Sequence, residues 1–199
     1  MDELPDYSAA IAYLRSADDR MATVIDAVGP CDLRPGGHRF SALADAIVSQ
    51  QISVQAAAAI WRRLESALGS VEPATIFAAD DPTLRGAGLS SQKVRYLRDL
   101  AAHFAAGALD DLPQLPDEAA IVRLTAICGI GRWTAEIYLL FGLGRLDMLP
   151  ADDLGLRYAV QRLCELEAPP PAREVRRIGQ IWQPYRSIAA WYLWRWRRI

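Results

Sequence analysis

The sequence predicts an all-α fold. Apolar side chains recur at intervals of three and four positions along most of the chain, and no stretch alternates apolar and polar residues as a half-buried strand does. Apolar residues make up 52% of the 199 positions, which is enough for a substantial core and too many for a disordered chain. The longest uninterrupted apolar run, residues 188–194, is too short to cross a membrane.

Cap residues, prolines and glycines place the helices in order along the chain. Ser8 is expected to cap a first helix that carries Leu14 and Met21 on one face and closes at Gly29. A loop with two glycines, at residues 35–37, separates it from the rest. The later helices are expected to begin at or near Phe40, Ser53, Pro73, Pro82, Ser90 or Ser91, Asp117, Arg132, Asp153, Ala172 and Tyr185.

Charge and cysteine content narrow the classes of function. A net charge of −2 argues against a polyanionic partner. The positive charge is uneven, however, because residues 173–199 hold seven arginines and one acid, and Lys93 is the sole lysine. A basic helix face that balances an acidic N-terminus is the simpler interpretation. Three scattered cysteines predict neither a disulfide framework nor a CxxC metal site, and no signal-peptide pattern opens the chain, which predicts a cytoplasmic protein.

Two of the expected helices are joined by a short glycine turn within residues 124–135, LTAICGIGRWTA. Gly129 and Gly131 allow a sharp turn, and Ile130 between them is expected to fill the gap between the helices. The free N–H groups at the start of the second helix then form a site for a phosphate. Such a contact reads no base sequence and suits binding to the DNA backbone. An ordinary helical hairpin is the alternative.

This segment resembles the helix-hairpin-helix of the endonuclease III-like DNA glycosylases. Four further blocks look like the 3-methyladenine DNA glycosylase II branch and occur in the expected order, at residues 47–53, 88–93, 149–153 and 182–187. The resemblance implies a two-lobed helical fold with the active-site cleft between the lobes, in a single domain that spans residues 1–199. About residues 1–40 and the C-terminal helices would form one lobe, and the middle helices with hairpin 124–135 the other.

The family has its catalytic aspartate soon after the hairpin, at the start of a helix, and two residues compete for this position. In the family an aliphatic residue follows the aspartate by three positions, and Leu156 meets this condition for Asp153. The spacing from Trp133 to Asp153 also matches. We therefore assign Asp153 as catalytic and expect Asp152 to cap the helix, although a capping role is the alternative for either carboxylate.

A single carboxylate suits the removal of an alkylated base. Breaking an N-glycosidic bond builds positive charge on the deoxyribose, which an anion stabilises, and a cationic base leaves without a second acid. Relatives that also cut the strand carry a Schiff-base lysine at the second position after Gly-x-Gly, where Trp133 stands here. This departure predicts a monofunctional enzyme. Three cysteines also exclude the four-cysteine iron–sulfur cluster of some relatives.

The resemblance also implies roles for residues around the extruded base. Trp133 and Trp194 would line a pocket where aromatic rings attract a cationic base, with Gln50 and Tyr138 close by. Gln51 would fill the gap that the extruded base leaves. Core packing is the alternative for each tryptophan, and a polar helix end for the glutamines. The hairpin residues expected to contact DNA are Gly129, Ile130, Gly131, Arg132 and Thr134.

The sequence therefore predicts a monomeric DNA glycosylase of base excision repair that releases alkylated bases, 3-methyladenine first and 7-methylguanine next, from double-stranded DNA. No organic cofactor is expected, and the one metal implied is a monovalent cation at hairpin carbonyls. His38 and His103 show no metal-ligand spacing and no expected partner. Cys128 replaces a proline common in this hairpin, from which we expect less rigidity and unchanged activity.

Three alternatives stay open at this point. The same fold can act on another lesion, such as hypoxanthine, uracil or a methylated cytosine. The chain can be a non-catalytic helix-hairpin-helix module that only binds DNA. It can also be a helical scaffold protein without a DNA partner, which salt-dependent binding to duplex DNA would exclude.

Overall fold

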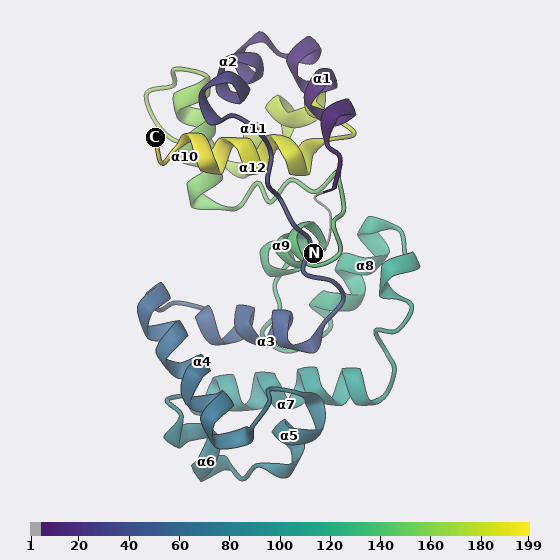
Figure 1. Cartoon of the computed structure of the whole chain (residues 1–199), viewed down its shortest axis with the longest axis vertical. Coiled ribbons are helices and arrows are strands. Elements are labelled where there is room, and N and C mark those ends of the chain that lie inside the picture. The colour runs from purple at the N-terminus through teal and green to yellow at the C-terminus, as the bar shows by residue number, and fades with distance from the viewer. Residues whose placement is uncertain (1–4) are drawn as a thin grey trace. The chain divides into compact units, whose positions relative to one another are not determined.

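A computed structural model describes residues 5–199, and within that range every regular element is a helix (Figure 1). The predicted all-α class is confirmed. The chain forms two compact units, which we call unit 1 (residues 1–35 and 139–199) and unit 2 (residues 36–138). No helix in the described range is long and apolar enough to span a membrane.

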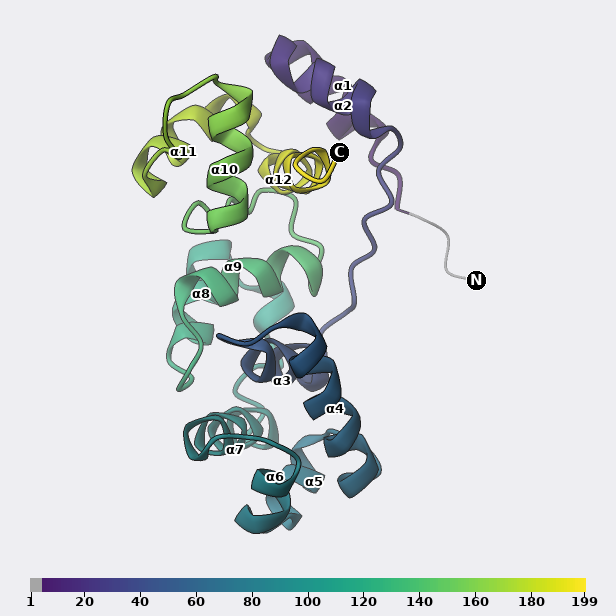
Figure 2. The ribbon, with the colours of Figure 1, turned by 90° about the vertical axis from the view of Figure 1, so that its left-hand side faces the viewer.

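Unit 1 is built around its last helix, α12 (Arg186–Trp196). Every residue from Ser187 to Leu193 is buried, because α2 and α10 pack on α12 from different sides (Figure 2). The apolar run in this segment is thus a buried core helix. The other elements of unit 1 are α1 (Ser8–Ala17), α2 (Asp19–Val28), α10 (Leu154–Leu163), α11 (Ala172–Ile178), the short 3₁₀ helix η2 (Gly179–Trp182) and the end of α9 (Arg132–Phe141).

The single first helix that we expected between Ser8 and Gly29 is wrong, because the chain breaks at Asp18. Asp18 has extended backbone angles, φ −150° and ψ 109°, and its buried carboxylate accepts hydrogen bonds from the Arg20 N–H (3.1 Å) and from Trp182 Nε1 (3.0 Å). A short acidic side chain that can bond its own backbone favours such a break. Ser8 is the first residue of α1 rather than its cap, and its N–H donates to Asp6 Oδ1 (2.9 Å).

Unit 2 begins with α3, and α7, which is as long as α4, packs against α3 and α5. Two predicted caps are confirmed here. Ser53 Oγ accepts the Ala56 N–H at the start of α4, and Ser90 Oγ accepts the Lys93 N–H at the start of α7, each at 3.2 Å. The elements are α3 (Phe40–Ser49), α4 (Val54–Leu68), α5 (Pro73–Ala78), α6 (Asp81–Gly86), α7 (Ser91–Ala105), the 3₁₀ helix η1 (Leu112–Gln114), α8 (Asp117–Thr125) and the first part of α9.

Candidate active site

The glycine turn joins α8 to α9 and packs on α7 within unit 2. Gly129 has φ +84°, and a Cβ atom there would lie 2.2 Å from Cδ2 of Tyr96, so the fold itself requires glycine. Ile127 and Ile130 are buried on either side, and the Ile130 N–H donates to the Ile127 carbonyl (3.1 Å). Ile130 therefore fills the space between the helices, as the sequence predicts.

Gly131 differs from Gly129 in what surrounds it. A Cβ atom on Gly131 would meet nothing within 4 Å, and its φ is in a range open to other residues. No contact within residues 5–199 therefore explains a glycine at this position. It stands directly before α9, whose first N–H groups have no carbonyl partner in the helix and attract anions. The absence of a side chain leaves space for a phosphate group to approach them.

Two side chains of unit 2 anchor the hairpin from outside it. Gln50 Nε2 donates to the Gly129 carbonyl oxygen (2.8 Å), and the backbone N–H of Cys128 donates to Asp99 Oδ2 (2.7 Å). Proline has no N–H and could not make the second bond. The backbone N–H of Cys128 thus links the turn to α7. This is the position where we expected the replacement of proline to make the turn less rigid.

The hairpin residues predicted to contact DNA have different surroundings. The guanidinium of Arg132 pairs with Glu118 (2.5 and 3.0 Å) and with Glu136 (2.9 Å), and the hydrogen bonds with Glu118 raise its pKa. Two carboxylates thus compensate the positive charge of this side chain. The group that Arg132 can offer to a phosphate at the start of α9 is its backbone N–H. Thr134 is buried.

Trp133 lies 41% exposed beside a hollow of about 530 Å³ in unit 2. This size is typical of pockets that hold small molecules. Burial raises the pKa of Asp45, which also faces the hollow. The side chains that line it come from α3, the turn after α3 and α9, and are Ala42, Asp45, Ala46, Ser49, Gln50, Gln51, Trp133, Thr134 and Ile137.

Tyr138 lies in the interior of unit 2 and is not among the residues that line this hollow. Its hydroxyl lies 2.6 Å from Nδ1 of His38, and burial raises its pKa to about 12. His38 also stacks on Phe104, with ring centroids 5.5 Å apart. The expectation that His38 has no partner is wrong, while a base-pocket role for Tyr138 stays a prediction.

In unit 1, Asp153 is the N-cap residue of α10. Its Oδ1 accepts the Leu156 N–H (2.7 Å) and the indole Nε1–H of Trp194 (2.8 Å). Asp152 instead pairs with Arg176 (2.7 Å) in the solvent-exposed part of the unit. Our expectation that Asp152 caps the helix is wrong, because the register of α10 places the N–H of Leu156 three residues after Asp153.

Trp194 therefore touches the candidate carboxylate directly. Its ring stacks on Phe141, with centroids 5.7 Å apart and planes at 27°, and its N–H points to Asp153. Gly155 is a residue that sequence reasoning missed. A Cβ atom there would lie 3.0 Å from Asp153 Oδ1 and 3.7 Å from Trp194 Cδ1, so glycine leaves room for this pair. The adjacent sequence DDLG carries no signal of that packing.

The excess of arginine near the C-terminus is largely compensated within unit 1. Among residues 5–199, four of the seven arginines after residue 172 form ion pairs: Arg176 with Asp152, Arg177 with Glu174, Arg186 with Asp147, and Arg195 with Asp32. The other three arginines, Arg173, Arg197 and Arg198, are exposed and can contact an anion. The positive charge left for a polyanion is thus smaller than the sequence suggests.

The described residues contain no group of three or more His, Cys, Asp or Glu side chains that could hold a metal ion. The carbonyls of Ile127 and Gly129 in the hairpin each accept one hydrogen bond. Because a carbonyl oxygen has two lone pairs, these bonds leave room for a monovalent cation. The cation itself stays a prediction.

The model of the HhH-GPD superfamily of base excision DNA repair proteins matches residues 44–184. The alkylbase DNA glycosidase-like protein mag2 of Schizosaccharomyces pombe is 32% identical, over 98% of this chain and 95% of its own length. DNA-3-methyladenine glycosylase 1 of the same organism is 36% identical, over 78% of this chain and 71% of its own length.

A solved structure shows the same fold. The 3-methyladenine DNA glycosylase Mag1 of Schizosaccharomyces pombe, in complex with abasic DNA, superposes with a TM-score of 0.83 and 33% identity. The match covers 94% of this chain and 95% of that one. The predicted class of helical fold is confirmed by this similarity.

Proposed function

The chain belongs to the HhH-GPD superfamily of base excision DNA repair proteins, and on this premise we propose that it is a DNA glycosylase that releases alkylated bases from double-stranded DNA. The expected substrates are 3-methyladenine and 7-methylguanine, and the product is an abasic site. The observation that carries the proposal is the carboxylate of Asp153, which two N–H donors hold at the start of α10. The relatives named as 3-methyladenine glycosylases support the substrate class.

DNA binding is assigned to the hairpin of unit 2. The N–H groups at the start of α9 bind a backbone phosphate, with Gly131 leaving space for it. Gln51 enters the gap in the stack, and the exposed ring of Trp133 receives the extruded base. A cationic base attracts an electron-rich indole, which contributes about 0.5–2 kcal/mol.

The chemical step is assigned to unit 1. As the bond from C1′ to the base nitrogen breaks, its electron pair goes to the cationic base, which leaves neutral. Positive charge develops on the sugar, and the carboxylate of Asp153 stabilises it. The oxygen of a water molecule then bonds to C1′ and loses one proton to the carboxylate of Asp153, which orients the water and passes the proton on to the solvent. Leu156 and Trp194 fix the direction of the carboxylate throughout.

We propose that this activity leaves the DNA strand intact. Trp133 stands where strand-cutting relatives have a nucleophilic lysine. Lys93, the sole lysine, donates its ammonium protons to the carbonyls of Val48 (2.6 Å) and Gln50 (2.9 Å). An ammonium held in this way has no lone pair for an imine.

Both units are needed for this activity, since the hairpin belongs to unit 2 and Asp153 to unit 1. We therefore propose that residues 1–199 act as one glycosylase domain and as a monomer. We also propose that the protein is cytoplasmic, and that it associates with the nucleoid if the organism is a bacterium.

A second candidate is a protein that binds DNA without releasing a base. It is favoured by the role of Asp153 as a helix cap, which gives this carboxylate a structural purpose of its own. Equal binding of duplex DNA is expected under both functions, so only the release of a base distinguishes them.

The proposal is tested by incubating the purified protein with methylated duplex DNA and with duplexes that carry a single hypoxanthine, uracil or methylated cytosine. We expect free 3-methyladenine and strand breaks only after alkali treatment. Preferred release of another base would overturn the substrate class. A covalent adduct trapped by borohydride would overturn the monofunctional assignment, and tight binding without any release would favour the second candidate.

A further inference from the structure

We propose that Lys93 is a positioning residue that holds the turn at Gln50 and Gln51 in the shape needed to extrude a base from duplex DNA. This inference rests on the proposed function and assigns a new role within it. Lys93 lies on α7, in a part of the sequence that the reaction itself does not use.

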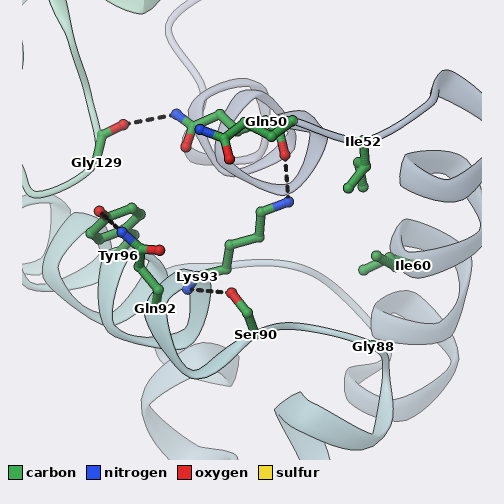
Figure 3. A pocket seen from close by; sticks show the side chains of 10 residues that line it. Gln50, Ile52, Ile60, Gly88, Ser90, Gln92, Lys93, Tyr96 and Gly129 are labelled. Atoms are coloured by element: carbon green, nitrogen blue, oxygen red, sulfur yellow. Dashed lines mark hydrogen bonds between the residues drawn. The ribbon is translucent and has the colours of Figure 1, made fainter.

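The first observation is the contact between Lys93 and the end of α3. Lys93 Nζ donates to the carbonyl oxygens of Val48 (2.6 Å) and Gln50 (2.9 Å), and Figure 3 shows its side chain reaching up from α7 to the turn. The last carbonyls of a helix lack partners in the helix and carry partial negative charge. An ammonium group at this place therefore fixes both carbonyls together.

The second observation is the backbone of the turn itself. Gln51 has φ +58°, a left-handed conformation that is unfavourable for a residue with a Cβ atom. Such a conformation persists only when the surrounding contacts determine it. Lys93 supplies these contacts on one side of the turn, and the bond from Gln50 Nε2 to the Gly129 carbonyl supplies them on the other.

The third observation is that Lys93 is itself well fixed. Its backbone N–H donates to the Ser90 cap (3.2 Å), so the residue is anchored in the first turn of α7. Its side chain is half-buried, and burial lowers its pKa. Its Nζ donates to two carbonyl oxygens of the turn, those of Val48 and Gln50. The two carbonyl oxygens are thus the partners that compensate its charge.

These contacts link Lys93 to the extrusion of the base. Rotating a nucleotide out of the stack has a free-energy cost that is lowest for an unpaired base. A turn that already has the right shape loses no further conformational freedom when Gln51 enters the DNA. Removing the ammonium should therefore slow release from a paired lesion more than release from an unpaired one.

The test compares Lys93→Met with the wild type on duplexes that carry one 7-methylguanine, either paired with cytosine or opposite an abasic-site analogue. We expect Lys93→Met to slow release of the paired lesion at least about tenfold and that of the unpaired lesion about threefold or less, as the loss of a charged hydrogen bond predicts. Lys93→Arg should restore part of the difference. Arg85→Met, which removes an exposed positive charge on α6, should leave both rates within about twofold of the wild type.

An equal loss on both substrates, or no loss, overturns the role of Lys93 and leaves the proposed function intact. A wild type that releases neither lesion nor any other alkylated base overturns both. Circular dichroism reports whether Lys93→Met folds. If it does not, Lys93→Arg decides: a loss of rate on the paired lesion that exceeds the loss on the unpaired lesion supports the inference, and a ratio of the two rates equal to that of the wild type overturns it.

Discussion

The two units hold their functional groups in different ways. In unit 1, N–H donors converge on one oxygen of one carboxylate, that of Asp153. In unit 2, side chains donate to backbone carbonyls, from Lys93 to the end of α3 and from Gln50 to the hairpin. Unit 1 thus fixes a charge, whereas unit 2 fixes the shape of the backbone. Substitutions in unit 1 should mainly affect the chemical step, and substitutions in unit 2 should mainly affect DNA binding and the extrusion of the base.

The largest effect is expected from Asp153→Asn. Asparagine is as good a helix cap as aspartate, so α10 should stay intact while the negative charge is lost. Base release should fall about 10³-fold, as it does when one electrostatic partner of a transition state is removed. Asp152→Asn is the matched control, because Asp152 pairs with the exposed Arg176, and its rate should stay within about threefold of wild type. The reverse pattern in a single-turnover assay would assign the chemistry to Asp152.

The next effect concerns the indole that holds this carboxylate. Trp194→Phe keeps the stacking on Phe141 and removes the N–H donor to Asp153. Release should slow about tenfold or more, since a hydrogen bond to a charged group contributes about 1.5–3 kcal/mol. Trp196→Phe is the control, because that ring packs against Arg162, 3.9 Å from its guanidinium, and not against Asp153. Equal rates in the two variants would contradict a positioning role for Trp194.

A smaller effect, on binding rather than on chemistry, is expected in unit 2. Gly131→Ala should fold normally, because its Cβ atom meets open space, and should weaken duplex binding about fivefold by crowding a phosphate. Gly129→Ala should instead lower the free energy of unfolding by about 1–3 kcal/mol, because its Cβ atom meets Tyr96. Urea unfolding and duplex titration separate the two. Unchanged binding by Gly131→Ala would remove the hairpin from the DNA interface.

The smallest effect on activity is expected from Asp18→Asn in unit 1. Burial raises the pKa of Asp18, but hydrogen bonds from Arg20 and Trp182 outweigh it and hold the pKa below its usual range. The stabilisation is therefore present at neutral pH and is lost as the pH falls through the lowered pKa. Asp18→Asn should lower the free energy of unfolding by about 1–3 kcal/mol at pH 7. The difference from wild type should shrink below about pH 4, and a difference that grows there would contradict this sign.

Local signals in the sequence predicted local structure well. The serine caps at Ser53 and Ser90 need only a hydroxyl three residues before a free N–H, and both are confirmed. The hairpin is also local, since Gly129 and Ile130 act within one turn. The break at Asp18 was not predictable in this way, because its partner Trp182 lies 164 positions away.

The same limit applies to the candidate site. Both aspartates at the start of α10 offer a carboxylate, and only the register of the helix and the distant Trp194 distinguish them. No local sequence pattern predicts the contact of Lys93 with α3. Val48 and Gln50, whose carbonyls it binds, precede it in the sequence by 45 and 43 positions. Residue roles that depend on such distant contacts can be assigned only from the three-dimensional structure. The sequence alone predicts the type of secondary structure and the protein family.

The most direct test of this division is to measure two quantities for Asp153→Asn and Gly131→Ala beside the wild type. These are the single-turnover rate of 3-methyladenine release at saturating protein and the Kd for duplex DNA. Asp153→Asn should lose release and keep its Kd within about threefold, whereas Gly131→Ala should weaken the Kd and keep its release rate within about threefold. Parallel losses of both quantities in both variants would contradict the separation of chemistry in unit 1 from DNA binding in unit 2.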